Sequence, residues 1–369
     1  MAITALGRYV NIPMQVTPST SKLSYGLQAL DRPGGPPNST MPKDCIVHLF
    51  SLKSGVHPGA GEVIAQVAKE DKVKILLSGI PHGWIHKPHH QDADRLLHHD
   101  WHLFLLTKTK AGAAAYTPSW PLPADAVTAH ITATIAIPYD QYDKLKADVA
   151  RERTRDLRRD SDSDASSEMR SSPQLPPGWV ERGTPLRRIP DKYIDKSSQT
   201  TESPAPPGTL RLDPSMAHFL STALPGTEAS GPVSLFNLFK YRNRDPSIHD
   251  KYMGDFKRAF GESARARVKF MGPVRTQFRE KEEMPSSDED GWQEANVTHC
   301  DSFYHYAHML STETYQKLNK NKVRGLEDTC ILLVSEGHAW SEKHFGSRTP
   351  LGYKTSWSEP DWGEYEDRD

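Results

Sequence analysis

The chain has 369 residues, enough for two or three folding units at roughly 150 residues each. Its 46 basic and 47 acidic residues give a formal net charge of −1. Nucleic acid and anionic membranes are therefore not expected as partners, because binding phosphate needs a surplus of Lys and Arg. Apolar residues make up 36% of the chain, below the roughly 45–50% of compact domains. We expect two modest cores joined by unstructured chain.

Residues 1–43 are predicted to be a disordered leader, because they end in a Pro-, Gly- and Ser-rich stretch typical of coil. They lack the apolar region of a signal peptide, and no run approaches 18 consecutive apolar residues, so no membrane partner is expected. Cys45, Cys300 and Cys330 are odd in number and far apart, which argues against a disulfide framework or a zinc site. These features favour a cytoplasmic protein, and a transit peptide over residues 1–30 is the alternative.

A first folded unit is expected over residues 44–150. Short apolar runs, together with an alternation of β-branched and small residues in the last of them, predict four strands. These strands are expected at 45–52, 73–80, 101–107 and 130–137. Apolar residues at helical spacing predict helices at 61–70 and 139–149.

Residues 151–230 are predicted to be a disordered linker. The segment opens with a run of nine residues dominated by Arg, Glu and Asp and continues into Ser- and Pro-rich sequence. Such a composition buries too little apolar surface to offset the entropy lost on ordering the chain. The acidic, Trp-containing residues 338–369 form a tail whose role the sequence leaves open: it either docks onto the folded part or binds a partner.

The second folded unit, residues 231–337, has the clearer pattern. Strands are predicted at 233–241, 268–274, 292–300 and 329–334, with an acidic loop at 277–291. One helix begins after Asp245-Pro246 and carries an apolar stripe that includes Tyr252 and Phe256, and another begins after Asp301 or Ser302. The order β-α-β-β-α-β is that of a ferredoxin-like, or split βαβ, unit.

Both helices of such a unit lie on one face of its sheet, so the other face needs a cover. The first unit is the nearest candidate, and a second copy of the chain, forming a homodimer, is the alternative. The predicted fold class is therefore α+β, with two ferredoxin-like units packed sheet to sheet as a pseudo-dimeric α/β barrel.

Several segments of the second unit resemble a dimeric α/β-barrel family found in two-domain proteins of filamentous fungi. The matching segments are Val233–Tyr241, the helix around Tyr252, Met271–Val274, Met309–Gln316 and Leu326–Leu332. The family is of uncharacterised function and is related to the antibiotic-monooxygenase and stress-responsive barrels. The resemblance covers about residues 233–336 well and the first unit only weakly. It implies two four-stranded sheets that enclose a pocket without a metal or a nucleotide cofactor, and it does not choose among activities.

A histidine-rich stretch raises the question of a metal site. Its members are His82, His86, His89, His90, His98, His99 and His102. His98 and His102 have the i, i+4 spacing that suits two ligands on one helix face. Pro81, Pro88 and the strand-like sequence from Trp101 argue against a helix there, so the favoured interpretation is a solvated polar loop without metal.

His299 is the candidate catalytic residue. It shares one strand face with Ala295 and Val297, and an imidazole beneath a pocket can act as an acid or base near neutral pH. A structural histidine bonded to a neighbouring group is the alternative. The predicted pocket residues are Asn237, Tyr241, Tyr304 and His305.

The sequence thus predicts a protein that binds a small hydrophobic or aromatic molecule in the barrel. Cofactor-independent cyclisation, isomerisation or oxygenation is the chemistry that such a pocket would support. The alternative is a non-catalytic interaction protein that recruits partners through its linker and tail. Polar groups converging inside the barrel would favour the pocket over the scaffold.

Overall fold

The computed structural model describes only part of the chain. The described residues are 41–53, 60, 63, 64, 67, 73–90, 93–109, 127–148, 189, 191–196, 209–223, 232–260, 265–280 and 291–336. Almost all of the predicted leader, most of the predicted linker and the whole predicted tail lie outside these residues.

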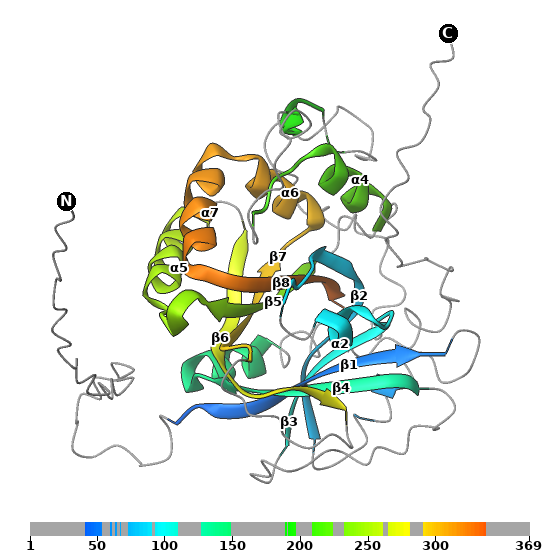
Figure 1. Ribbon diagram of the computed structural model, residues 1–369. Coiled ribbons are helices and arrows are strands. Elements are labelled where there is room, and N and C mark those ends of the chain that lie inside the picture. The colour runs from blue at the N-terminus through cyan, green and yellow to red at the C-terminus, as the bar shows by residue number, and fades with distance from the viewer. Residues whose placement is uncertain are drawn as a thin grey trace, which may run out of the picture. The chain divides into compact units, whose positions relative to one another are not determined.

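Eight strands close into a barrel in which every neighbouring pair is antiparallel (Figure 1). The first half of the chain supplies β1 (Lys43–Leu52), β2 (Val73–His86), β3 (Leu103–Thr109) and β4 (Val127–Ile137). The second half supplies β5 (Val233–Tyr241), β6 (Ala266–Glu280), β7 (Glu294–Cys300) and β8 (Leu326–Glu336). Their order around the barrel is β1-β3-β2-β8-β5-β7-β6-β4. The two halves therefore join at two seams, β2 with β8 and β4 with β6.

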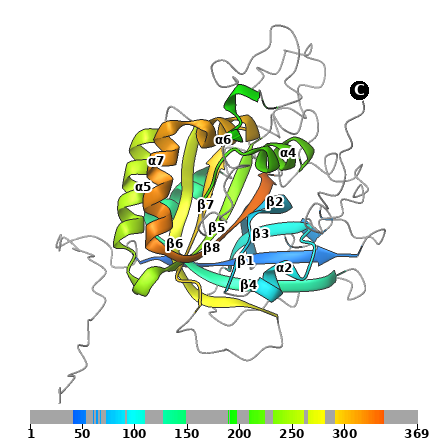
Figure 2. The same ribbon diagram turned by 45° about the horizontal axis from the view of Figure 1, so that its top comes forward.

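Helices cover the outside of the barrel. The described helices are α2 (Ala93–Leu97), residues 139–148, α4 (Pro214–Ala223), α5 (Ser247–Phe260), α6 (Phe303–Ser311) and α7 (Glu313–Gly325), with short 3-10 turns at Asp191–Tyr193 and Arg242–Arg244. Figures 1 and 2 show α5 and α7 side by side against the sheet of the second half. The side chains of Ser302 and Thr312 cap α6 and α7 by accepting hydrogen bonds from backbone N–H groups. None of the described helices is both long and apolar enough to cross a membrane.

The barrel axis is filled with apolar side chains from both halves. Alternate strand residues point inward, and Val47, Phe104, Ile135, Phe236 and Leu332 are all at most 1% exposed within one continuous core. The rings of Phe104 and Phe236, one from each half, lie 5.2 Å apart between centroids. Burying each such side chain stabilises the fold by about 1.5–3 kcal/mol. Each half thus covers the apolar sheet face of the other half. A pocket was expected along the barrel axis, but around Phe104 and Phe236 the axis is filled with side chains.

Each predicted strand overlaps an observed one, and β2 and β6 extend furthest beyond their predicted ends. The predicted loop after residue 80 is wrong up to His86, because β2 continues and pairs with β8, with register shifts beside Pro81 and Trp84. The predicted loop at 277–291 is likewise wrong for 277–280, where β6 continues and pairs with β4; residues 281–290 lie outside the described part. Both extensions depend on pairing across the seams, which local sequence does not reveal.

Part of the predicted linker is folded. Helix α4 buries Phe219 and Leu220 in the core that lies under α5, α6 and α7, and Leu210 and Leu212 join the same core. The expectation of a disordered segment over 151–230 is therefore wrong for 209–223. This stretch is ordered because its apolar residues lie on one face of the helix and pack against α6.

At each seam a glycine lies close to the backbone of the neighbouring strand. A Cβ added at Gly272 of β6 would overlap the carbonyl oxygen of Ala136 of β4, and one at Gly79 of β2 would overlap the carbonyl oxygen of Ser335 of β8. No side chain fits between these strands, so both seams depend on a residue without a Cβ.

Substitution Gly272→Ala should lower the free energy of unfolding by about 1–3 kcal/mol, because the methyl group forces the β4–β6 seam apart. Urea unfolding followed by circular dichroism measures this change. Gly254→Ala is the matched control: a Cβ there meets only the end of the Arg258 side chain, and alanine in a helix interior should stabilise by about 0.5–1 kcal/mol. Equal stability of Gly272→Ala and the wild type would contradict the seam geometry.

Candidate ligand pocket

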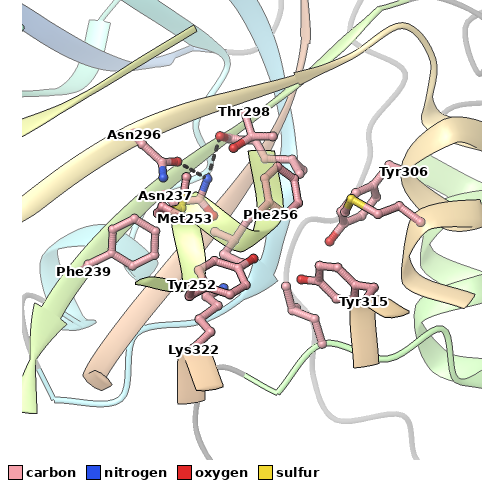
Figure 3. A pocket seen from close by; sticks show the side chains of 14 residues that line it. Asn237, Phe239, Tyr252, Met253, Phe256, Asn296, Thr298, Tyr306, Tyr315 and Lys322 are labelled. Carbon is pink, nitrogen blue, oxygen red and sulfur yellow. Dashed lines mark hydrogen bonds between the residues drawn. The ribbon is translucent and has the colours of Figure 1, made fainter. Parts of the chain in front are cut away.

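A pocket lies between the outer face of the second half's sheet and the helices that cover it. The pocket is partly open to solvent: its empty space, counted together with the open part, is about 390 Å³, and its cavity volume is about 30 Å³. Strands β5, β7 and β8, helices α5, α6 and α7 and the segment before α4 supply its lining (Figure 3). The lining residues are Leu210, Leu235, Asn237, Phe239, Tyr252, Met253, Phe256, Asn296, Thr298, Tyr306, Met309, Tyr315, Lys322 and Ile331. A cavity of this volume holds about two water molecules, so a larger ligand has to use the open part of the pocket or displace lining side chains. The pocket lies outside the barrel axis.

Backbone periodicity explains why these residues meet. On β5 the alternate residues Leu235, Asn237 and Phe239 face the helices, while Phe236 and Leu238 belong to the core along the barrel axis. On α7 the residues Tyr315 and Lys322 are seven positions apart, two helical turns, so they lie on the same face.

The sheet side of the pocket carries an amide pair. Asn237 and Asn296 are directly opposite in the β5–β7 ladder. The Asn237 Nδ2 group donates to Asn296 Oδ1 at 2.7 Å and to the Leu235 carbonyl oxygen at 2.8 Å (Figure 3). These bonds fix the orientation of a buried polar pair that lines the cavity.

Tyrosines line the helix side. Tyr252 and Tyr315 hydrogen-bond to each other, and burial raises the pKa of both hydroxyls. The Tyr306 hydroxyl is fully buried and makes no hydrogen bond with any described residue. Figure 3 shows all three side chains around the same space. A buried hydroxyl without a partner is costly, and a ligand oxygen in the pocket would satisfy it.

Lys322 is the distinctive residue of the pocket. It is 3% exposed, and within the described part of the chain its Nζ atom makes no hydrogen bond and no ion pair. Its closest recorded partner is the ring of Phe239, whose centroid lies 5.8 Å from Nζ. Burial lowers the pKa of Lys322 to about 8. An ammonium group in an apolar site without a counter-ion favours losing its proton or gaining an anion.

Two histidines near Lys322 are uncharged. The pKa of His249 is lowered to about 3 and that of His86 to about 4, in both cases first by burial and then by the charge of Lys322. Both imidazoles are therefore neutral near pH 7. On the same helix, by contrast, the exposed Lys317 pairs with Glu313 at 2.7 Å.

Of the residues predicted to line a pocket inside the barrel, Asn237 lines this pocket on the outer face of the sheet and the other three lie elsewhere. The hydroxyl of Tyr241 is 3.2 Å from Nδ1 of the buried His249. Tyr304 and His305 lie in the first turn of α6, where His305 Nδ1 is 2.8 Å from the Ser302 hydroxyl. Sequence analysis missed Lys322, Tyr306 and Asn296. The signal for Lys322 was its two-turn spacing from Tyr315 in an otherwise polar helix.

His299 points toward the barrel axis rather than into the pocket. Its Nδ1 atom is 2.6 Å from Glu336 Oε1, and its Nε2 atom is 3.4 Å from Asp301 Oδ1. Glu336 also accepts hydrogen bonds from Ser234 and, at 2.7 Å, from Lys269 Nζ. Burial lowers the pKa of His299, but the hydrogen bonds to Asp301 and Glu336 outweigh it, so the net shift is upward. Both ring nitrogens face carboxylates, the arrangement of a structural imidazolium rather than of a free base.

The histidine-rich stretch is distributed over several elements. His82 and His86 belong to β2, and His82 Nε2 is 2.6 Å from the Ser335 hydroxyl. The backbone N–H groups of His89 and His90 donate to the buried carboxylate of Asp328. Among the residues that the structure describes, no group of three or more His, Cys, Asp or Glu side chains could hold a metal ion.

In comparisons with known proteins, no family profile, curated protein or solved structure matches the chain. The geometry of the described residues is therefore the basis for a functional assignment.

The His299–Glu336 pair predicts a pH-dependent contribution to stability. His299 has a raised pKa in the fold, so its contribution is complete below its ordinary pKa of 6.5 and is lost as the pH rises through the folded value. Glu336 has a lowered pKa, because Lys269 and His299 outweigh the effect of burial, so its contribution is lost as the pH falls below about 4.5. The free energy of unfolding of His299→Gln should be lower than that of the wild type by about 1.5–3 kcal/mol near pH 6, and this difference should shrink toward pH 9.

His308→Gln is the control for this measurement, because burial lowers the pKa of His308. The contribution of His308 should be lost as the pH falls below 6.5, the opposite dependence. A difference between wild type and His299→Gln that stays constant from pH 5 to 9 would contradict the ionic pairing of His299.

Proposed function

We propose that this protein binds a small aromatic or apolar molecule carrying one oxygen-bearing group, in the pocket between β5, β7, β8 and helices α5, α6 and α7. The observation that carries the proposal is Lys322, a buried amine in the wall of a cavity that has no counter-ion among the described residues. A carboxylate, phenolate or carbonyl oxygen would supply the partner that these residues do not.

The rest of the lining supports the same ligand class. Phe239, Phe256 and Met253 offer an apolar surface for an aromatic body. Asn296 and the unpartnered hydroxyl of Tyr306 offer hydrogen bonds that fix its orientation. A mostly apolar cavity with a few convergent polar groups is the usual form of a small-molecule site.

We also propose that each half is a ferredoxin-like unit, which would make the barrel pseudo-dimeric and related to the dimeric α/β-barrel family. The strand orders support this interpretation: β4-β1-β3-β2 in the first half corresponds to β8-β5-β7-β6 in the second. Cofactor-independent acid/base chemistry remains part of the proposal, with the pocket rather than His299 as its location.

Calorimetric titration with benzoate, salicylate, phenylacetate and butyrate tests the binding proposal. At least one of these anions should bind the wild type, and Lys322→Met should weaken that binding about tenfold or more, because a hydrogen bond to a charged group is lost. Methionine keeps the approximate length of the side chain and removes its charge.

Lys317→Met is the matched control on the same helix and should bind as the wild type does, because Lys317 is exposed and paired with Glu313. Failure of all four anions to bind would contradict the proposal. So would equal affinities of the wild type and Lys322→Met.

A further inference from the structure

We infer that Lys322 is a nucleophile that forms a reversible imine with the carbonyl group of a small aromatic aldehyde or ketone. This inference rests on the proposed function, since it needs the same pocket, and it narrows the ligand's oxygen-bearing group to a carbonyl. The observations are the burial of the amine, its position in the cavity wall and the absence of an ion partner among the described residues.

The surroundings of Lys322 increase the fraction of the neutral amine, which is the nucleophilic form. Acidic side chains of this region interact with other groups. Asp328 accepts hydrogen bonds from the backbone N–H groups of His89 and His90, and Glu294 Oε1 lies 3.6 Å from His249 Nδ1. With a pKa of about 8, roughly 200 times more of Lys322 is neutral at pH 7.5 than of an ordinary lysine with a pKa of about 10.4. Desolvation in an apolar pocket is one of the known ways by which a lysine is activated for imine formation.

The pocket also offers a partner for the carbonyl oxygen. The Tyr306 hydroxyl is buried, lines the cavity and makes no hydrogen bond with a described residue. It can donate a hydrogen bond to the oxygen while Nζ attacks the carbon. Phe239, beneath the Lys322 amine, supplies an apolar surface for the ring of the ligand.

The step balances without an oxidant or reductant. The Nζ lone pair forms a bond to the carbonyl carbon, and the C=O π electrons move to the oxygen, which takes up a proton. The carbinolamine then loses its hydroxyl group and the remaining N–H proton as water, and the C=N bond forms. Amine and carbonyl compound thus give imine and water, and hydrolysis reverses the reaction.

Benzaldehyde with sodium cyanoborohydride tests the inference on the full chain, because reduction of the imine leaves a stable benzyl group on the lysine. Peptide mass spectrometry should find Lys322 modified at pH 7.5 at least about tenfold faster than Lys317, and benzoate should slow the modification of Lys322 only. Lys317→Met should leave the adduct at Lys322 unchanged, because Lys317 is exposed and paired with Glu313.

The outcomes separate the two proposals. If a carboxylate of the binding panel occupies the pocket but Lys322 is modified no faster than Lys317, the imine is overturned and the binding function stands. If no anion of the panel binds and Lys322 shows no preferential modification, both are overturned. Competition by benzoate in the wild type distinguishes a reaction in the pocket, which benzoate slows, from general lysine labelling, which it does not.

Discussion

The fold depends on the mutual burial of two apolar sheet faces. Four strands from each half of the chain bring their inward side chains together along one axis, where Phe104 and Phe236 meet across the halves. Closing the barrel also satisfies strand edges that would otherwise stay unpaired. A packed axis shifts the position of the candidate ligand pocket: it lies on the outer face of the second half's sheet, under its helices.

Two buried lysines differ in whether a carboxylate lies beside the amine. Lys269 has a side chain 5% exposed and lies 2.7 Å from the carboxylate of Glu336, which His299 also contacts. Lys322 is equally buried and has no such partner among the described residues. The first cation is part of a structural network that ties β6, β7 and β8 together. The second faces a cavity with its charge uncompensated, an arrangement that weakens the fold and is typical of sites that bind or react.

The sequence predicted those elements whose pattern is local. The strand at 233–241 has the bounds of β5, and the helix with Tyr252 and Phe256 is α5. What it missed depended on distant partners: the extension of β2 through Pro81 needs β8, and the burial of α4 needs the core beneath α6. Asn237, one of the predicted pocket residues, lines the observed pocket. Lys322 was missed because its neighbours along α7 are polar, so that only its spacing from Tyr315 indicates a buried face. His299 lies on the expected strand face, but its carboxylate partners Asp301 and Glu336 could not be predicted from strand periodicity.

The central claim is that Lys322 is a buried amine with no counter-ion in the part of the chain that the structure describes, and the titration of its amine tests this directly. In protein with ¹³C-labelled lysine side chains, the Cε resonance that Lys322→Met removes should titrate with a midpoint near pH 8. The resonance that Lys317→Met removes serves as the exposed reference. A midpoint for Lys322 at the ordinary lysine value of about 10.4 would contradict the account, because it would show an amine that is solvated or paired with an acid.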